Sequence, residues 1–505
     1  MACEKKFEVI SDLSEGLHFI SGKRCTIQAE KTFPVYEPRI GKVVAQCPIS
    51  DAAEVDRVVG IAAKAQPEWG NMHVFERAKV LRNVATLIRD NLDALARAEV
   101  LCNGKPIYEA RMDLESSADT FDFYAGAAST VLSTGLQYEL PGGPQKRFAY
   151  SRREPFGVVG GIGAWNYPFQ TAVWKVAPAL AAGNAMVYKP SPFAPLSPVI
   201  IGEILTAAGL PNGVYNVIQG EAETGQALCL NEKVKKVSFT GSVATGKAIQ
   251  RACAENNIKP VTLELGGKSP LIIFEDSDIK SAVSAAMLAN FLNQGQVCTN
   301  ATRVFVQKSI ISQFTENLLK EADAKLKVGD PLKEDTRIGA SINEQQLNKV
   351  LGFIESAKQE GATVLRGGTR VHPEGVEDGF YFEPAIISDL KDSMKVVREE
   401  IFGAVLLILP FESEDEVVRR ANGTGFGLAT GVFSGNLARG HRMASKLDAG
   451  TVFINTYNDV DVHVPFGGFK ESGHGRENCV ESLQAFTQIK AVYVNVEDKL
   501  DHCFD

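Results

Sequence analysis

Four short segments contain residue types that can carry out covalent or acid–base chemistry, and the first centres on a cysteine. Cys298 lies in Asn293-Gln-Gly-Gln-Val-Cys298-Thr-Asn, after an amphipathic helical pattern. Most cysteines are inert buried thiols, and that interpretation stays open here. The polar amide-rich flanks favour a loop and a nucleophile, because a thiolate needs nearby hydrogen-bond donors.

The second segment contains an isolated carboxylate in an apolar strand pattern. Glu264 stands between Leu263 and Leu265 and is followed by Gly266 and Gly267. Burial would raise the pKa of this carboxyl and make it a usable general base near neutral pH. The alternative is a solvated residue at the end of a surface strand.

The other two segments suggest sites for anionic groups. Lys236-Val-Ser-Phe-Thr-Gly241-Ser242-Val-Ala-Thr-Gly246-Lys247 has the pattern of a strand, a turn and a helix start. Such a turn exposes backbone N–H groups to a phosphate, although an ordinary strand-to-helix turn would have the same pattern. Asn166 follows the apolar segment 157–164, and its amide could stabilise an oxyanion or form an Asx turn before Pro168.

Composition excludes several other classes of protein. The 505 residues predict two to four domains, and 53 basic against 61 acidic residues give a net charge of −8 without a basic cluster, so we expect no nucleic-acid partner. No apolar run reaches about 18 residues, so we expect no membrane partner. The first residues resemble neither a secretory signal nor a transit peptide, which predicts a cytoplasmic protein. The nine scattered cysteines form no Cys-x-x-Cys pair, which predicts neither a disulfide framework nor a metal site.

The elements that must position these residues follow an alternating pattern typical of an α/β fold. Short apolar runs at 157–164, 185–189, 215–219 and 235–240 alternate with helical patterns at 200–208, 224–230 and 245–255. This predicts βαβ units and a doubly wound parallel sheet. A second alternation begins after Gly266, with strands expected at 271–274, 303–306, 405–410 and 451–454. We therefore expect two α/β domains with a cleft between them.

Two further segments with β character have no obvious place in such sheets. They cover residues 137–150 and 491–496. A protruding ribbon that contacts another subunit is one solution for strands of this kind.

Together, the four motifs resemble the aldehyde dehydrogenase superfamily in order and spacing, over residues 35 to 490. Segments 157–190, 260–274 and 289–307 are most similar to the members that act on betaine aldehyde and 4-trimethylaminobutyraldehyde. The resemblance implies a Rossmann-like NAD-binding domain (1–131 and 155–265), a catalytic α/β domain (266–475) and an oligomerisation ribbon and tail (132–154 and 476–505). It also implies NAD as cofactor, a small aldehyde as substrate and a homotetramer.

The resemblance implies a catalytic role for five residues. Cys298 attacks the aldehyde to give a thiohemiacetal, and Asn166 stabilises the oxyanion. After hydride transfer to NAD, Glu264 activates the water that hydrolyses the thioester. Lys175 and Glu477 match positions associated with proton relay.

The resemblance also implies a cofactor site. Its residues are Trp165, Lys189, Phe239, Gly241, Ser242, Gly246, Leu265, Gly266, Glu400 and Phe402. Two positions depart from the family pattern. Pro192 replaces a glutamate, common in NAD-specific members, that binds the ribose 2′-hydroxyl, so NADP use is not excluded. Ala404 replaces a proline, with little effect expected.

The resemblance implies an aromatic substrate tunnel. Tyr167, Trp174 and Phe466 match ring positions that hold a trimethylammonium group by cation–π attraction, worth about 0.5–2 kcal/mol per contact. Leu292 replaces a tryptophan typical of plant betaine aldehyde enzymes, which favours a longer aminoaldehyde. Segments 112–120 and 455–463 are expected as further walls, with Glu115, Asp459 or Asp461 as sources of negative charge.

Four other functions compete with this one. A broad-specificity aliphatic or aromatic aldehyde dehydrogenase and a catalytically silent NAD-binding structural protein would have the same fold. A CoA-acylating enzyme is disfavoured because Glu264 is present. A cysteine hydrolase is disfavoured because no histidine lies in a motif typical of a base.

Overall fold

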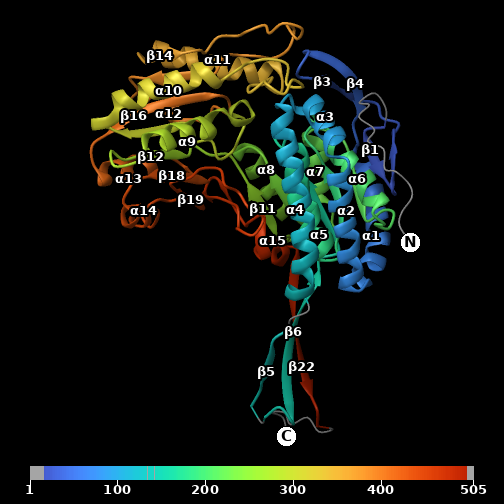
Figure 1. Ribbon diagram of the computed structural model, residues 1–505. Coiled ribbons are helices and arrows are strands. Elements are labelled where there is room, and N and C mark those ends of the chain that lie inside the picture. Colours follow the sequence, from blue (N-terminus) through green and yellow to red (C-terminus); the bar gives the residue numbers. More distant parts are fainter. Residues whose placement is uncertain (1–15, 133–134, 142, 498–505) are drawn as a thin grey trace.

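The apolar runs that alternate with helices form two separate sheets (Figure 1). The computed structural model describes residues 16–132, 135–141 and 143–497. The two ends of the chain, which the sequence assigns to the NAD-binding domain and to the tail, therefore lie partly outside the described residues.

The first sheet has eight strands in the order β2-β1-β9-β8-β7-β10-β11-β21. Its strands are β1 (His18–Ile20), β2 (Lys23–Cys25), β7 (Val158–Ile162), β8 (Ala185–Lys189), β9 (Tyr215–Val217), β10 (Val234–Thr240), β11 (Val261–Glu264) and β21 (Gly473–His474). The five strands from β9 to β11 are parallel, and their order reverses direction between β7 and β10. This is the doubly wound arrangement that the sequence predicts, and ligands bind such sheets outside the carboxyl ends of the strands.

The register of this sheet brings the predicted site residues to one edge. Ile162 pairs with Lys189 on one side and with Phe239 on the other, and Thr240 pairs with Glu264. The strands β7, β8, β10 and β11 therefore end at the same level.

Helices cover both faces of the first sheet. On one face α1 packs against α7, which packs against α8; on the other, α5 and α6 pack together beneath α2 and α4. These helices are α1 (Ala52–Asn71), α2 (Val74–Asp90), α3 (Leu92–Asn103), α4 (Ile107–Val131), α5 (Pro168–Ala181), α6 (Leu196–Ala207), α7 (Ala222–Leu230) and α8 (Val243–Glu255). A hairpin of β3 (Thr32–Glu37) and β4 (Lys42–Pro48) precedes them.

The second sheet has seven strands in the order β14-β15-β16-β13-β12-β18-β19, all parallel except the edge strand β14. They are β12 (Pro270–Ile273), β13 (Arg303–Gln307), β14 (Thr363–Arg366), β15 (Ala385–Ser388), β16 (Val405–Phe411), β18 (Ala429–Phe433) and β19 (Thr451–Ile454). The helices of this half are α9 (Ile279–Phe291), α10 (Ile311–Lys325), α11 (Glu344–Gln359), α12 (Lys395–Arg398), α13 (Glu414–Asn422) and α14 (Leu437–Ala444), with 3₁₀ turns at Leu292–Gly295 and Lys308–Ile310.

The segments near residues 137–150 and 491–496 form a three-stranded ribbon that projects from the body of the molecule (Figure 1). Its strands are β5 (Gln137–Glu139), β6 (Arg147–Pro155) and β22 (Thr487–Asn495), and β22 pairs with the whole of β6. The ribbon exposes several large apolar side chains, namely Leu136, Tyr138, Ile489, Tyr493 and Val496.

The chain returns to the first sheet after it has completed the second. β21 pairs antiparallel with β11, although it lies inside the range predicted for the catalytic domain. Just before it, β20 (Phe469–Lys470) pairs antiparallel with the distant strand β17 (Phe426–Gly427) in a short two-stranded sheet. The helix α15 (Cys479–Ala485) follows, and Leu483 and Phe486 pack into the core of the first sheet. The domain boundaries drawn from the sequence stay predictions.

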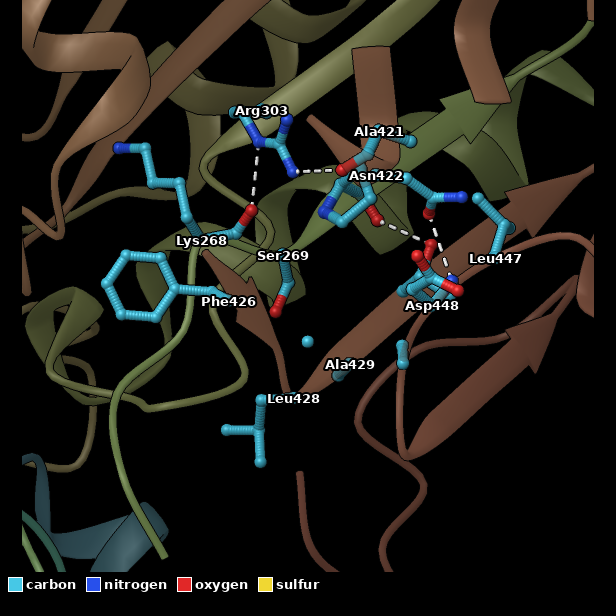
Figure 2. A pocket seen from close by; sticks show the side chains of 14 residues that line it. Lys268, Ser269, Arg303, Ala421, Asn422, Phe426, Leu428, Ala429, Leu447 and Asp448 are labelled. Atoms are coloured by element: carbon cyan, nitrogen blue, oxygen red, sulfur yellow. Dashed lines mark hydrogen bonds between the residues drawn. The ribbon is translucent and has the colours of Figure 1, made fainter. Parts of the chain in front are cut away.

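A buried arginine ties the segment between the two sheets to the second sheet (Figure 2). Arg303, at the start of β13, donates from Nε to the Lys268 carbonyl (2.9 Å) and from Nη1 and Nη2 to the carbonyls of Arg420 (2.9 Å) and Ala421 (2.8 Å) at the end of α13. A cavity of about 10 Å³ beside it has room for about one water molecule.

The described residues contain neither a membrane-spanning helix nor a cluster of metal ligands. Across 16–132, 135–141 and 143–497, no helix combines the length and apolar composition needed to cross a lipid bilayer. No group of three or more His, Cys, Asp or Glu side chains in these ranges is arranged to hold a metal ion.

Replacement of Arg303 by methionine should destabilise the fold, because it leaves three backbone acceptors without their donor. Unpaired buried polar groups cost about 1–3 kcal/mol each, so we expect the free energy of unfolding to fall by at least about 3 kcal/mol, measured by urea denaturation. The control is Arg57→Met, whose ion pair with Glu54 is half-exposed and worth about 0–1 kcal/mol. Equal stability of the two variants would contradict the role of Arg303.

Candidate active site

One cavity of about 880 Å³ joins the carboxyl ends of the parallel strands of the first sheet to the segment around Cys298. All but three of the site residues predicted from the sequence line it. The cavity-lining ones are Trp165, Asn166, Tyr167, Trp174, Lys189, Phe239, Gly241, Ser242, Glu264, Leu265, Gly266, Leu292, Cys298, Glu400, Phe402 and Phe466. Lys175, Gly246 and Glu477 do not line it.

A left-handed turn directs the chain from α9 to Cys298. Asn293, Gln294 and Gly295 have φ angles of 48°, 55° and 72°. A Cβ on Gly295 would lie 2.1 Å from the carbonyl carbon of Gly403, so only glycine fits there. Non-glycine residues in this region cost about 1–3 kcal/mol each and persist only where contacts hold them.

Contacts from both halves of the molecule hold this turn. The Asn293 backbone N–H donates to Oε2 of Glu109 on α4 (2.7 Å), and its side-chain amide donates to the Asn166 carbonyl (2.8 Å). The Gln294 side chain donates to the carbonyl of Ala340 (2.9 Å). Cys298 therefore has a defined position between the two sheets.

The environment of Cys298 disfavours its thiolate form. Burial, reinforced by the nearby carboxylates of Glu264 and Glu400, raises the pKa of the thiol to about 12. Asn166 lies next to the same loop, and its Nδ2 donates to the Gln296 carbonyl (2.9 Å). Because an amide nitrogen carries two N–H groups, Asn166 has a second donor to offer.

Glu264 ends β11 as a buried carboxyl facing the cavity. Neither of its oxygens has a hydrogen-bond partner among the described residues, and the side chain is 3% exposed. Burial, with the charge of Glu477 in the same direction, raises its pKa well above the usual range. A carboxyl in this state can take up and release a proton near neutral pH, as a general base must.

A buried ion pair lies behind Glu264. The Lys175 ammonium donates to Oε1 of Glu477 (2.8 Å) and to the hydroxyl of Thr240 (2.6 Å), and Ser238 donates to the same Glu477 oxygen (2.9 Å). Lys175 and Glu477 lie outside the cavity wall, whereas Thr240 is part of it. The pair can therefore exchange protons with the cavity only through neighbours such as Thr240 and Glu264.

At one end of the cavity lie the residues predicted to bind the adenosine part of the cofactor. Lys189 ends β8, donates to the Pro190 carbonyl (3.0 Å), and has its pKa lowered to about 8 by burial. Ser242 caps α8 by accepting from the Thr245 N–H (3.3 Å). Gly246 has a packing role instead, because a Cβ there would lie 2.8 Å from the Leu265 side chain.

Glu400 and Phe402 reach the cavity from the second half of the chain. Glu400 accepts from the Gly267 N–H (3.0 Å), and a Cβ on Gly266 would lie 2.3 Å from its Oε1. The Phe402 ring meets the Trp165 ring edge-on, with centroids 5.1 Å apart. These contacts bring residues of the two sheets together around the middle of the cavity.

Aromatic rings line the end of the cavity beyond Cys298, where the substrate was expected. Trp174 and Phe466 lie with their ring centroids 5.1 Å apart, and Leu292 and Tyr167 share the wall. The Lys105 ammonium lies 3.9 Å from the centroid of the Tyr167 ring. The protein's own cation therefore covers one face of this ring, leaving at most the other face for a ligand.

The carboxylate that lines this part of the cavity is Asp113, which lies in the expected wall 112–120 but is not among the acids named from the sequence. Asp113 pairs with Lys105, and the buried acids Glu99 and Glu109 lie close to the same lysine, so acids outnumber the lysine. Burial raises the pKa of Asp113. It also raises the pKa of Glu109, to about 8. The i, i+4 spacing of Glu109 and Asp113 on one helical face was the available signal.

The acidic residues suggested from the sequence lie elsewhere. Glu115 is 3.6 Å from Arg89, Asp461 accepts from His463, and Asp459 accepts from Thr456; none lines the cavity. The expected walls do contribute Met112, Ser116, Asn458 and Val460. Pro192 also lines the cavity, and its side chain has no group that could bind a ribose hydroxyl.

Comparison with known proteins gives consistent matches over nearly the whole chain. The model of the aldehyde dehydrogenase family matches residues 26–492. The 4-trimethylaminobutyraldehyde dehydrogenases of Bos taurus and Homo sapiens are each 50% identical over 489 residues, which cover 96% of this chain and 98% of theirs. The crystal structure of betaine aldehyde dehydrogenase from Staphylococcus aureus in complex with NAD+ is similar, with a TM-score of 0.92, 35% identity and coverage of 97% of this chain and 96% of that one.

The raised pKa of Cys298 predicts how its alkylation by iodoacetamide depends on pH. Because only the thiolate reacts, the rate at Cys298 in the ligand-free protein should rise about tenfold per pH unit between pH 7 and 9.5. Peptide mass spectrometry measures this residue separately from the other cysteines. In urea-denatured protein the same peptide should level off near an ordinary thiol pKa of about 8.5. A plateau below pH 9 in the folded protein would contradict the prediction.

Proposed function

The chain belongs to the aldehyde dehydrogenase family, and we propose that it oxidises a cationic aminoaldehyde to the carboxylate with NAD as hydride acceptor. The first candidates are 4-trimethylaminobutyraldehyde and betaine aldehyde, the substrates named for its relatives. The observation that carries the proposal is the single cavity in which Cys298 and Glu264 lie between a nucleotide-type crevice and an aromatic pocket with a carboxylate.

We propose that Cys298 is the nucleophile. Its sulfur forms a bond to the carbonyl carbon, the carbonyl π electrons move onto oxygen, and the free N–H of Asn166 stabilises that oxygen in the resulting thiohemiacetal. Because burial raises the pKa of the thiol, the thiolate needs a positive charge nearby to form near neutral pH. NAD, when bound, supplies that charge on its nicotinamide ring and accepts the hydride.

Loss of the hydride from carbon leaves a thioester on Cys298. Glu264 is the proposed base for its hydrolysis: it takes a proton from water, the water oxygen bonds to the thioester carbon, and the bond to sulfur breaks to release the carboxylate. Its unpartnered oxygens and raised pKa suit this role. The buried pair of Lys175 and Glu477 is the proposed relay for the proton.

The chain's residues fit the cofactor in the crevice. Backbone N–H groups at Gly241 and Ser242, at the start of α8, suit a pyrophosphate. Lys189 and Glu400 offer a donor and an acceptor to ribose hydroxyls, while Trp165, Phe239, Leu265, Gly266 and Phe402 form the apolar and backbone lining. The unit of the first sheet is accordingly the proposed NAD-binding domain, and 266–475 the proposed catalytic domain.

The substrate class follows from the charge and the rings beyond Cys298. The described acids near the tunnel outnumber Lys105, and the rings of Trp174 and Phe466 can attract a quaternary ammonium group. Asp113 is the proposed cation-directing carboxylate. We also propose a cytoplasmic location, which the seven described free thiols support.

We propose that the ribbon joins copies of this chain, with a homotetramer as the expected assembly. Large apolar side chains on the exposed ribbon, such as Ile489 (65% exposed) and Tyr493 (74% exposed), favour burial against a second copy. The strands β5 and β22 are edge strands whose backbone groups can pair further.

The substrate proposal predicts a charge-specific effect of Asp113→Asn. This change removes the carboxylate that pairs with Lys105 and lines the tunnel, so kcat/KM for 4-trimethylaminobutyraldehyde should fall at least about tenfold more than for neutral hexanal, since about 1.4 kcal/mol of lost attraction corresponds to tenfold. NADH formation is followed by absorbance. Glu115→Gln, on the same helix but outside the cavity, is the matched control.

Two results would refute these proposals separately. Full NADH formation by Cys298→Ala would exclude the mechanism. Equal losses for both aldehydes in Asp113→Asn would exclude the cationic substrate class and favour a broad-specificity aldehyde dehydrogenase.

The assembly proposal predicts that charged substitutions on the ribbon dissociate the oligomer. We expect light scattering of the wild type to give about four times the chain mass of 54.6 kDa. The double variant Ile489→Asp, Tyr493→Asp should give a smaller species with an unchanged circular dichroism spectrum. Asp substitutions at exposed Phe75 and Leu437, which lie outside the ribbon, are the control. An unchanged mass of the ribbon variant would refute the interface.

A further inference from the structure

The wall around Lys189 contains a carboxylate to which no function has yet been assigned. Glu221 lines the cavity at the start of α7, as do Ala222 and Gly225 of the same helix. A Cβ on Gly225 would lie 3.6 Å from Cδ of Lys189, so the first turn of α7 packs directly on the lysine side chain. Glu221 therefore belongs to the adenosine end of the crevice.

The carboxylate of Glu221 is available to a ligand. The residue occupies the N-cap position of α7, yet its side chain accepts no capping hydrogen bond. Glu221 is exposed, and none of the hydrogen bonds or ion pairs found in the described part of the chain uses its side chain. Its charge does act on Lys189, whose pKa it raises against the larger effect of burial.

The neighbouring wall lacks the carboxylate that a ribose 2′-hydroxyl would need. Pro192, three residues after Lys189, lines the same cavity and offers no acceptor on its side chain. With Lys189 as the only charge, this end of the crevice would attract a 2′-phosphate. Glu221 reverses that preference, because its charge opposes that of Lys189 and repels a second anion.

We propose that Glu221 sets the preference of this chain for NAD over NADP, by accepting a hydrogen bond from the ribose 2′-hydroxyl and repelling a 2′-phosphate. The inference rests on the proposed binding of NAD in this cavity. In the family pattern the residue at position 192 determines the cofactor preference. In this chain that role passes to Glu221, at the start of α7.

Calorimetric titration with NAD and with NADP tests the proposal without requiring turnover. Wild-type protein should bind NAD at least about tenfold more tightly than NADP, and Glu221→Gln should lower that ratio about tenfold, mainly through tighter NADP binding. The matched control is Glu223→Gln, two residues further along α7 and outside the cavity lining, which should leave the ratio unchanged. Because no cap is lost, the thermal midpoint of Glu221→Gln should equal that of the wild type.

The outcomes separate this inference from the proposed function. If the wild type binds NAD but Glu221→Gln keeps the same ratio, the role of Glu221 is refuted and cofactor binding stands. If Glu223→Gln shifts the ratio as much as Glu221→Gln, the ratio depends on the net charge of this region, and a specific role of Glu221 is refuted. If the wild type binds neither dinucleotide, the proposed function itself fails, and the inference with it.

Discussion

The left-handed turn at Asn293–Gly295 is the constraint on which the rest of the site depends. Asn293 and Gln294 occupy a backbone region that costs free energy for non-glycine residues, and each is held by a group from a distant part of the chain, while Gly295 lies too close to Gly403 for any side chain. Glu109 and Asn166 come from the first half, and Ala340 and Gly403 from the second. The turn therefore aligns the two sheets with respect to each other and fixes Cys298 where their surfaces meet.

The same meeting of surfaces produces the unusual electrostatics of the site. Partial or full burial raises the pKa of Glu264, Glu400 and Cys298 together, and no cation of the described residues lies at hydrogen-bonding distance from them. Lys175 and Glu477, one layer deeper, neutralise each other through a direct bond. The site thus disfavours the charged forms of these three groups, whereas the deeper pair is stabilised as an ion pair.

The sequence predicts those features that depend on local pattern. The strands at 185–189 and 451–454 are found at the predicted residues, and the residues after β7, β8, β10 and β11 meet at one edge because parallel strands must end together. Glu221 could not be recognised in this way, because its importance arises from Lys189, which approaches it only in the folded chain. For Asp113 the spacing from Glu109 indicates a shared helical face, but only the folded chain brings Lys105 to it. Gly246 illustrates the converse, because a motif position proves to pack on Leu265 instead of lining the cavity.

The return of the chain to its first sheet has a consequence for protein synthesis. Strand β11 stays an uncovered edge until β21 emerges from the ribosome, and the core lacks Leu483 and Phe486 until the same time. At about 5–20 residues per second, the roughly two hundred intervening residues take about 10–40 seconds to translate. During that interval the nascent first unit exposes a strand edge next to Glu264, so its final folding is delayed and the edge is exposed to aggregation or to chaperone binding.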